Sequence, residues 1–262
     1  MPLLPPVIGH RGAAACAPEN TLGGFRRARA LGCRWVEFDV RLTADGELIL
    51  LHDERLERTT DGSGKACAQP LATIRRHDAG GWFGPAFAGE IVPTLAEAVG
   101  VLGELGLGAN VELKAARGRE AETGAAAADL LRRSWPPHLP APLISSFLPT
   151  ALAAARDHAP EIARGLLVRA VPRHRRLLAG SLGCVSVHAE HGHLRPGIVA
   201  EMRESGYSVV AYTVNDPARA RELFAWGVTS VFSDVPHMIL AELPAAAWHP
   251  VDALSGSAAA TR

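Results

Sequence analysis

The sequence lacks the features that would place it among disulfide-rich, zinc-binding or membrane proteins. It has only four cysteines, and none is spaced as Cys-x-x-Cys; they are Cys16, Cys33, Cys67 and Cys184. This scatter favours free thiols over disulfides or zinc ligands. No apolar run approaches the roughly 18 residues that a membrane-spanning helix needs.

The chain also lacks an excess of charge of either sign. Lysine plus arginine equals aspartate plus glutamate at 27 each, so no basic charge attracts nucleic acid or an anionic membrane. The first ten residues, MPLLPPVIGH, contain neither the basic nor the long apolar segment of a signal peptide. We therefore expect a cytoplasmic protein that binds neither nucleic acid nor a membrane.

What the sequence does contain is a regular alternation of strand-like and helix-like segments. Its 262 residues, 48% of them hydrophobic, suit one large domain or two small ones. Helices are expected at about 21–31, 94–105, 119–133, 150–158, 173–178, 196–205 and 217–226. Strands are expected at 7–9, 35–40, 48–51, 109–114, 143–147, 165–168, 184–188, 208–214 and 230–233. This pattern predicts an α/β fold, a TIM (β/α)8 barrel, in which one of the nine strands is in excess.

Two stretches depart from the alternation. Residues 54–92 are rich in glycine, charge and aromatics, and we expect them to form a small insertion after the third strand. The Ala/Ser/Pro-rich stretch 241–262 is expected to be a frayed tail, which leaves 1–240 as the barrel domain. Trp82 and Phe83 in the insertion could line a substrate mouth, but packing within the insertion explains them equally well.

A histidine and an arginine follow the first strand, at His10 and Arg11. Ligand sites of α/β proteins gather at the carboxyl ends of strands. Histidine exchanges protons near neutral pH, and the forked guanidinium of arginine suits phosphate. The alternative is a histidine that only satisfies the local turn.

A second histidine, His52, follows the third strand. If Asp45 and Gly46 are the two central residues of a hairpin turn, counting back along the ladder places Asp39 opposite His52. A parallel arrangement with an extended return would give the same proximity. Either way His52 is expected beside the carboxylates of the second strand.

Three carboxylates, Glu37, Asp39 and Glu112, lie near strand ends and are expected to face inward. Carboxylate oxygens are the ligands that Mg²⁺ and Ca²⁺ prefer, so the trio predicts a divalent metal site, Mg²⁺ or alternatively Ca²⁺. The alternative is a set of ion pairs with the nearby cations Arg11, Arg41 and Lys114.

Together these residues suit the cleavage of a phosphodiester. Two imidazoles beside a metal, His10 and His52, could take a proton from the nucleophile and give one to the leaving alkoxide. Arg11 and Lys114 would neutralise phosphate oxygens. The strand-end aromatics Phe147 and Tyr212 are candidates for a substrate wall. His188, His191 and His193 match no zinc spacing and are expected to have a loop or rim role.

Successive motifs resemble those of the glycerophosphodiester phosphodiesterases, in order from about residue 7 to 240: HRG…PENT, EFDV, LLHD, RTTDG, VELK and YTVN. Further stretches, such as DAGGWFGPAFAGE and LGCVSVH, look like the cytoplasmic bacterial enzyme associated with glycerol-3-phosphate uptake. The resemblance implies metal-dependent hydrolysis of glycerophosphodiesters to sn-glycerol 3-phosphate and an alcohol. It makes His10 and His52 the acid/base pair. The sequence does not assign which is the acid, and we take His52 as the candidate. The family often has Trp where this chain has Tyr212, so the fine substrate preference is open.

The resemblance also implies that Glu37, Asp39 and Glu112 are the metal ligands and that Arg11 and Lys114 contact phosphate. Two other functions compete with this interpretation. A lipase on a related barrel would act on membranes, but the chain shows no evident amphipathic docking helix. A non-catalytic binding domain would be expected to lack a catalytic residue, and none is missing. The sequence leaves a monomer and a homodimer equally open.

Overall fold

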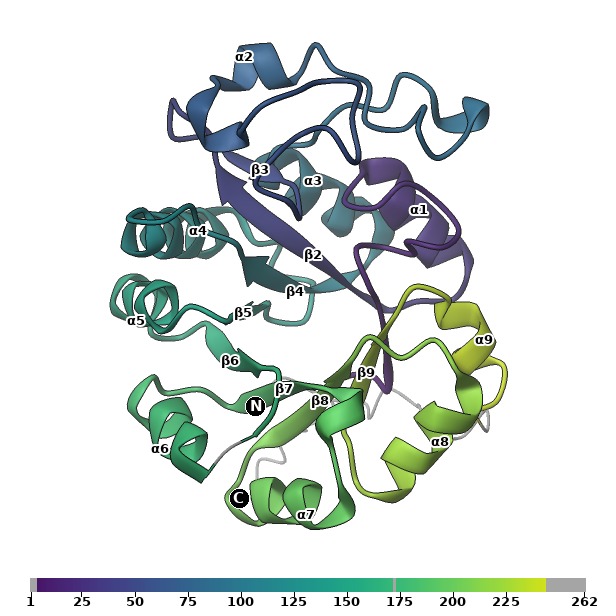
Figure 1. The fold of residues 1–262 in the computed structure, drawn as a ribbon, viewed down its shortest axis with the longest axis vertical. Coiled ribbons are helices and arrows are strands. Elements are labelled where there is room, and N and C mark those ends of the chain that lie inside the picture. Colours follow the sequence, from purple (N-terminus) through teal and green to yellow (C-terminus); the bar gives the residue numbers. More distant parts are fainter. Residues whose placement is uncertain (1–3, 172, 244–262) are drawn as a thin grey trace, which may run out of the picture.

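Eight parallel strands close into a barrel in the computed structural model, which describes residues 4–171 and 173–243 (Figure 1). Strand β1 pairs with β9 on one side and with β2 on the other, which closes the ring. The barrel strands are β1 (Val7–Gly9), β2 (Trp35–Leu42), β4 (Gly108–Leu113), β5 (Leu143–Ser146), β6 (Ala163–Val168), β7 (Ser186–Glu190), β8 (Ser208–Tyr212) and β9 (Ser230–Ser233). The predicted TIM barrel is confirmed.

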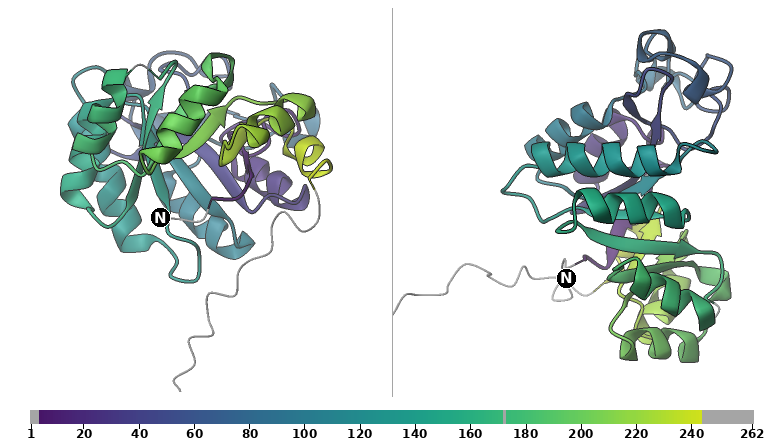
Figure 2. Two further views of the ribbon diagram at one scale, coloured as in Figure 1. Left: turned by 90° about the horizontal axis from the view of Figure 1, so that it is seen from below. Right: turned by 90° about the vertical axis from the view of Figure 1, so that its left-hand side faces the viewer.

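Helices surround the barrel and follow its strands (Figures 1 and 2). They are α1 (Leu22–Ala30), α3 (Leu95–Leu105), α4 (Glu120–Ser134), α5 (Pro149–His158), α6 (Arg173–Ser181), α7 (Pro196–Glu204), α8 (Pro217–Ala225) and α9 (Pro236–Leu240). Their starts agree with the sequence, because Thr21 caps α1 and Thr94 forms a capping box with Glu97 at the start of α3. In the described residues, no helix is both long and apolar enough to cross a membrane.

The main core lies between the strands and the helices, as burial of both faces of a parallel sheet requires. A smaller apolar cluster is formed by Leu4, Ile8, Trp35, Leu143, Val210 and Phe232. All four cysteines carry free thiols. Most of the stretch expected to be a frayed tail, 244–262, lies outside the described residues.

One strand, β3 (Leu48–Leu50), does not belong to the eight-stranded barrel and is the strand predicted to be in excess. It runs antiparallel to β2 at the outside of the barrel, with Val40 opposite Leu50. The predicted hairpin direction is therefore right, but the predicted register is wrong by one residue: Leu51, rather than His52, donates to the Asp39 carbonyl at 3.1 Å. The reason is a three-residue loop, whose last residue, Gly46, has φ +85°.

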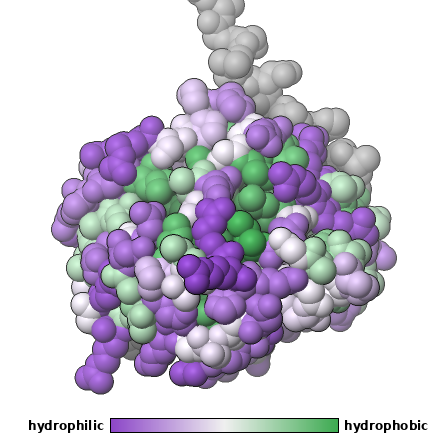
Figure 3. Space-filling model, turned by 90° about the horizontal axis from the view of Figure 1, so that it is seen from above, coloured by the Kyte–Doolittle hydropathy of each residue, from purple (hydrophilic) through white to green (hydrophobic). Residues whose placement is uncertain are grey.

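Residues 54–92 lie outside the barrel beside β3, at the top of Figure 1. They contain one turn of helix, α2 (Leu71–Ile74), and two short 3-10 turns, Ala66–Ala68 and Pro85–Phe87. A separate small core supports them and consists of Ile49, Leu51, Leu56, Ala66, Ile74, Ala79 and Val92. Trp82 packs edge-on against Phe83 at 5.6 Å, so the aromatics pack within this segment. Hydrophilic and hydrophobic side chains alternate on the end of the molecule that it forms (Figure 3).

Candidate active site

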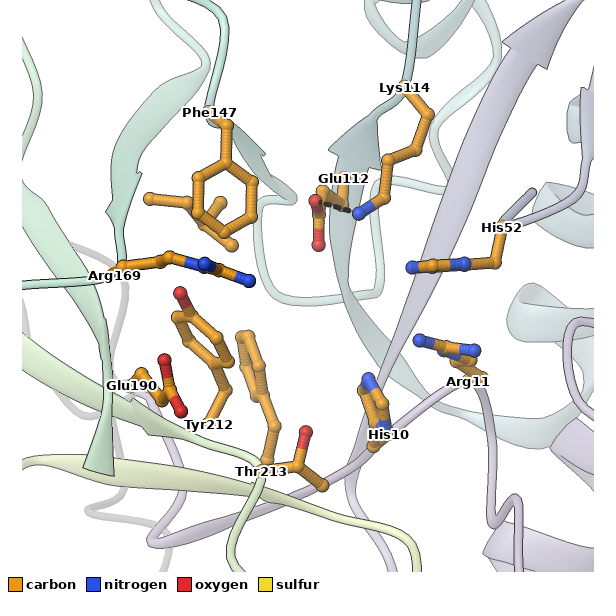
Figure 4. Close-up of a pocket in the computed structure, with 12 residues that line it drawn as sticks. His10, Arg11, His52, Glu112, Lys114, Phe147, Arg169, Glu190, Tyr212 and Thr213 are labelled. Carbon is orange, nitrogen blue, oxygen red and sulfur yellow. Dashed lines mark ion pairs between the residues drawn. The ribbon is translucent and has the colours of Figure 1, made fainter. Parts of the chain in front are cut away.

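A polar pocket of about 370 Å³ opens at the carboxyl ends of the barrel strands (Figure 4). The structure brings both predicted histidines, both predicted cations and one of the three predicted carboxylates to its wall. The lining residues are His10, Arg11, His52, Glu112, Lys114, Phe147, Leu167, Arg169, Glu190, Tyr212, Thr213 and Phe232.

The other two predicted carboxylates lie directly beneath this wall. Glu37 and Asp39 are two residues apart on β2 and therefore share a face, and Asp39 is the register partner of Glu112 on β4. One oxygen from each of Glu37, Asp39 and Glu112 lies within 4.8 Å of the others, and all three residues are buried. Three buried carboxylates this close repel one another unless positive charge compensates them.

Burial and mutual repulsion perturb the trio strongly. Burial, together with Asp39 and Glu112, raises the pKa of Glu37 well above its ordinary value. Burial also raises the pKa of Glu112, to about 7, although Lys114 opposes this shift. For Asp39 burial acts in the same direction, but Lys114 and Arg11 outweigh it and lower the pKa to about 2. Lys114 and Arg11 thus compensate the negative charge of Asp39 far better than that of Glu37 or Glu112.

The ion-pair alternative for the trio accounts for part of this geometry. Lys114 Nζ lies 2.5 Å from Glu112 and 3.5 Å from Asp39, and Arg11 Nε lies 3.5 Å from Asp39. Arg41, the third cation considered, instead donates to the His52 carbonyl at 3.0 and 2.7 Å. Among the described residues, the buried Oε1 of Glu37 has no hydrogen-bond partner. An unpartnered carboxylate oxygen beside two more carboxylates fits a hard divalent cation.

Asn20 fixes Asp39 through two hydrogen bonds, a role that was not predicted from the sequence. Its amide nitrogen donates to Asp39 Oδ2 at 2.9 Å, and its oxygen accepts from the Asp39 backbone N–H at 3.1 Å. Asn20 has φ +57°, a conformation that asparagine tolerates better than most residues. Thr21, the next residue, is the actual cap of α1.

His10 is oriented by a residue from the other end of the chain. Its Nδ1 lies 2.6 Å from Oδ1 of Asp234, and its Nε2 lies 3.8 Å from Oε2 of Glu37. Asn215 donates to the second Asp234 oxygen at 2.7 Å. Burial raises the pKa of Asp234, but the hydrogen bond from His10 and further contacts lower it overall. A carboxylate only accepts, so Nδ1 carries the proton and Nε2 is left for the pocket.

His52 is oriented by its neighbour in sequence. Its Nδ1 lies 2.6 Å from Oδ1 of Asp53, which is the same arrangement as between His10 and Asp234. Asp53 is held in turn by Arg58, whose Nε donates to Oδ2 at 2.7 Å. Burial lowers the pKa of His52, although Asp39 opposes the shift.

The aromatic wall lies across the pocket from the two histidines (Figure 4). Phe147 packs edge-on against Tyr212 at 5.9 Å, and the Tyr212 hydroxyl donates to the Val168 carbonyl at 2.9 Å. Arg169 and Glu190 stand on the same side, and neither was among the predicted site residues. Their positions, just after β6 and at the end of β7, could have identified them.

The expected rim role is wrong for His188. It lies in β7 rather than after it, is fully buried, and packs edge-on against Phe232 at 5.4 Å. Its Nε2 shares a hydrogen bond with Ser186 Oγ at 2.9 Å, and burial lowers its pKa to about 3. His191 and His193 do follow the strand, in a 3-10 turn.

Comparison with known proteins assigns the site to a family. Residues 10–238 match the glycerophosphoryl diester phosphodiesterase family. A glycerophosphodiester phosphodiesterase of Caldanaerobacter subterraneus is 32% identical over 241 residues, which make up 89% of this chain and 96% of that protein.

Solved structures agree with this match. An Oleispira antarctica phosphodiesterase in complex with the product sn-glycerol-3-phosphate aligns with a TM-score of 0.88 and 42% identity, over 91% of this chain and 96% of that one. A glycerophosphodiester phosphodiesterase of Agrobacterium tumefaciens aligns with a TM-score of 0.75 and 30% identity, over 91% of this chain and 100% of that one. The chain described here therefore belongs to the glycerophosphodiester phosphodiesterase family and is an enzyme of that kind.

Proposed function

We propose that this enzyme hydrolyses glycerophosphodiesters to sn-glycerol 3-phosphate and an alcohol with a divalent cation and two histidines. The observation that carries the proposal is the position of the buried carboxylate trio beside two imidazoles, each held by its own carboxylate at 2.6 Å. The product found in the Oleispira relative supports the choice of substrate class.

Glu37, Asp39 and Glu112 would hold the cation, which we propose to be Mg²⁺ with Ca²⁺ as the alternative. When bound, such an ion supplies positive charge at the phosphate oxygens. Arg11 and Lys114 add further positive charge from the protein itself and orient the phosphate. Both are more than half buried and already lie among the carboxylates, so they need little reorganisation to do so.

Each histidine presents Nε2 to the substrate because its Nδ1 is held by a carboxylate. One neutral imidazole takes the proton from the attacking hydroxyl at Nε2, and one protonated imidazole gives the Nε2 proton to the leaving alkoxide. Asp234 and Asp53 stabilise the imidazolium form of His10 and His52 respectively. We propose His52 as the acid, and a comparison of leaving groups tests this choice.

Phe147 and Tyr212 would form the wall of the substrate site. We further propose a cytoplasmic monomer or homodimer that acts on small molecules rather than on nucleic acid or a membrane. Its phosphodiesterase domain would span 1–240, with 54–92 as an insertion. The four free thiols support a reducing compartment.

Metal removal tests the central part of the proposal. Purified enzyme treated with excess chelator should lose activity on glycerophosphodiesters, and added Mg²⁺ or Ca²⁺ should restore it. Glu37→Gln and Asp39→Asn should each raise the metal concentration needed for half-maximal activity, whereas Glu122→Gln, which alters an exposed carboxylate, should not. Full activity of the unmodified enzyme in chelator would contradict the proposal.

A further inference from the structure

We propose that Arg58 is a positioning residue that holds His52 and Arg11 in their working orientations at the same time. It contacts neither residue directly and acts through two carboxylates, Asp53 and Glu19. The inference rests on the roles proposed above for His52 and Arg11.

Arg58 is connected to His52 through Asp53. Its Nε donates to Asp53 Oδ2 at 2.7 Å and its Nη2 to Asp53 Oδ1 at 3.1 Å. Oδ1 is also the atom that His52 Nδ1 contacts at 2.6 Å. The fork therefore fixes the plane of the carboxylate, and the carboxylate fixes the ring. Without the fork, Asp53 can turn and carry the imidazole with it.

Arg58 is also connected to Arg11, through Glu19. Arg58 Nη1 and Nη2 donate to the two oxygens of Glu19 at 2.7 and 2.8 Å. Arg11 Nη1 donates to Glu19 Oε1 at 2.7 Å. Burial raises the pKa of Glu19, but its bonds and charge contacts with the two arginines lower it overall. If Arg58 is removed, Glu19 can neutralise Arg11 more completely and weaken its attraction for phosphate.

The backbone around Arg58 is anchored by residues 54–92. Leu56 is fully buried in the small core of this segment, and its N–H donates to the Gly64 carbonyl at 3.1 Å. Thr60 donates back to the Leu56 carbonyl through both its N–H, at 3.0 Å, and its hydroxyl, at 2.8 Å. The segment thus presents one side chain at a defined place beside the pocket.

The geometry favours a role in positioning over a role in stability. The Arg58 side chain is 44% exposed, and exposed ion pairs contribute little to stability. The planar guanidinium of Arg58 binds Asp53 and Glu19 with separate N–H groups at the same time. A lysine ammonium, which is a compact point charge, cannot hold both carboxylates in the same way. Arg58→Lys should therefore behave much like Arg58→Ala although it keeps the charge.

The test measures kcat and KM separately on a glycerophosphodiester with an alkyl leaving group. Arg58→Ala and Arg58→Lys should lower kcat by up to about 10–100-fold, the cost expected for loss of Asp53, the direct partner of His52, and should raise KM. Arg55→Ala is the matched control, because Arg55 also forks onto a carboxylate, Glu57, in the same segment. It should leave both constants within about twofold. Unchanged kinetics of both Arg58 variants would overturn the proposal.

Double variants then identify the path of each effect. In a His52→Ala background, Arg58→Ala should lower kcat little further, and in a Glu19→Gln background it should raise KM little further. Fully multiplicative losses in both backgrounds would overturn the proposal even if Arg58→Ala is impaired.

A spectroscopic measurement separates this inference from the proposed function. The Nδ1 proton of His52, assigned by its loss in His52→Ala, should be observable by NMR in the unmodified enzyme and in Arg55→Ala. It should exchange faster with water in both Arg58 variants. An unchanged exchange rate would refute positioning by Arg58, whereas near-normal activity of His52→Ala would refute only the catalytic role of that histidine.

Discussion

His10 and His52 reach the same local geometry from two very different regions of the molecule. In both, Nδ1 lies 2.6 Å from a carboxylate oxygen. For His10 the carboxylate is 224 residues away, beyond the last barrel strand, and for His52 it is the next residue. The His10 side chain is 15% exposed and that of His52 is 32% exposed. One histidine is therefore positioned by closure of the barrel, and the other by ion pairs at its rim.

The two regions differ in what they can tolerate. The β1–β9 ladder holds His10 through its backbone, since the His10 N–H donates to the Ser233 carbonyl at 2.8 Å. The surroundings of His52 depend on charged side chains from loops, which are easier to replace without loss of the fold. Substitutions in either region should thus lower the catalytic rate to a similar extent. Only substitutions around His10 should also lower the free energy of unfolding of the barrel.

The largest effects are expected from the histidines themselves. His10→Ala and His52→Ala should each lower kcat by roughly 10²–10⁴-fold, the range for general acid–base groups. An activated aryl leaving group needs little protonation, so it should rescue the variant that lacks the acid, which we propose is His52→Ala. His158→Ala is a matched control, because His158 also contacts an aspartate, Asp129, at 3.0 Å, but is exposed on the outside. If both variants keep near-normal rates, the comparison has no catalytic meaning.

Smaller losses are expected from the two orienting carboxylates. Asp234→Asn and Asp53→Asn should each reduce kcat about 10–100-fold, because an amide can present its NH₂ to Nδ1 and favour the wrong tautomer. Only Asp53→Asn should also abolish the effect of Arg58→Ala on kcat, whereas the effect on KM, which runs through Glu19, should remain. Steady-state kinetics of the three single and two double variants measure this, and identical coupling of both aspartates to Arg58 would contradict the distinction between the two regions.

The small core of residues 54–92 offers a way to separate the regions by stability. Leu56→Ala should destabilise that segment by about 2–5 kcal/mol, the usual cost of truncating a buried leucine. Amide hydrogen exchange should accelerate across 54–92, while the β1–β9 ladder around His10 keeps its protection. Leu102→Ala, on the buried face of α3 in the main core, is the contrasting variant. Equal acceleration throughout the barrel in Leu56→Ala would show that the segment does not open independently.

A third histidine, His188, offers a contrast because its Nε2 bonds to a hydroxyl, that of Ser186, and its Nδ1 has no hydrogen-bond partner among the described residues. Burial lowers its pKa to about 3, from an ordinary value of 6.5. Between these values the unfolded chain binds the proton and the folded one does not, so this group makes stability fall as pH falls from 6.5 to 3. His188→Gln should flatten the dependence of the urea midpoint on pH in that window. His138→Gln, on the surface, is the control, and an unchanged slope in His188→Gln would contradict the assignment.

The sequence predicted the barrel well because each βα unit carries its own local signals. The capping residues Thr21 and Thr94 and the strand-end charges at His10, Asp39 and Lys114 are examples. The hairpin register was missed because nothing in Asp45-Gly46 distinguishes a two-residue from a three-residue loop. A single residue of difference changes which side chain faces Asp39.

The residues that orient the two histidines were also not predicted, whether 224 residues away, as Asp234 is from His10, or nearby, as Arg58 is to His52. Asp234 and Arg58 carry no periodicity or motif that assigns them to a histidine, and only the closed ring and the folded segment bring them there. His188 was predicted to be the last residue of its strand, with a loop or rim role, but the strand Ser186–Glu190 continues two residues beyond it and His188 is fully buried. Long-range packing, rather than local preference, decided all three positions.

The pairing of His10 with Asp234 has a consequence for how the enzyme is made. The histidine is synthesised 224 residues before its carboxylate. Translation is slow compared with local folding, so the early βα units can form long before the ring has its last strand. A nascent or prematurely ended chain would carry the histidine without its carboxylate. Full activity therefore requires that synthesis has passed β9, because only then can the ring close and Asp234 pair with His10.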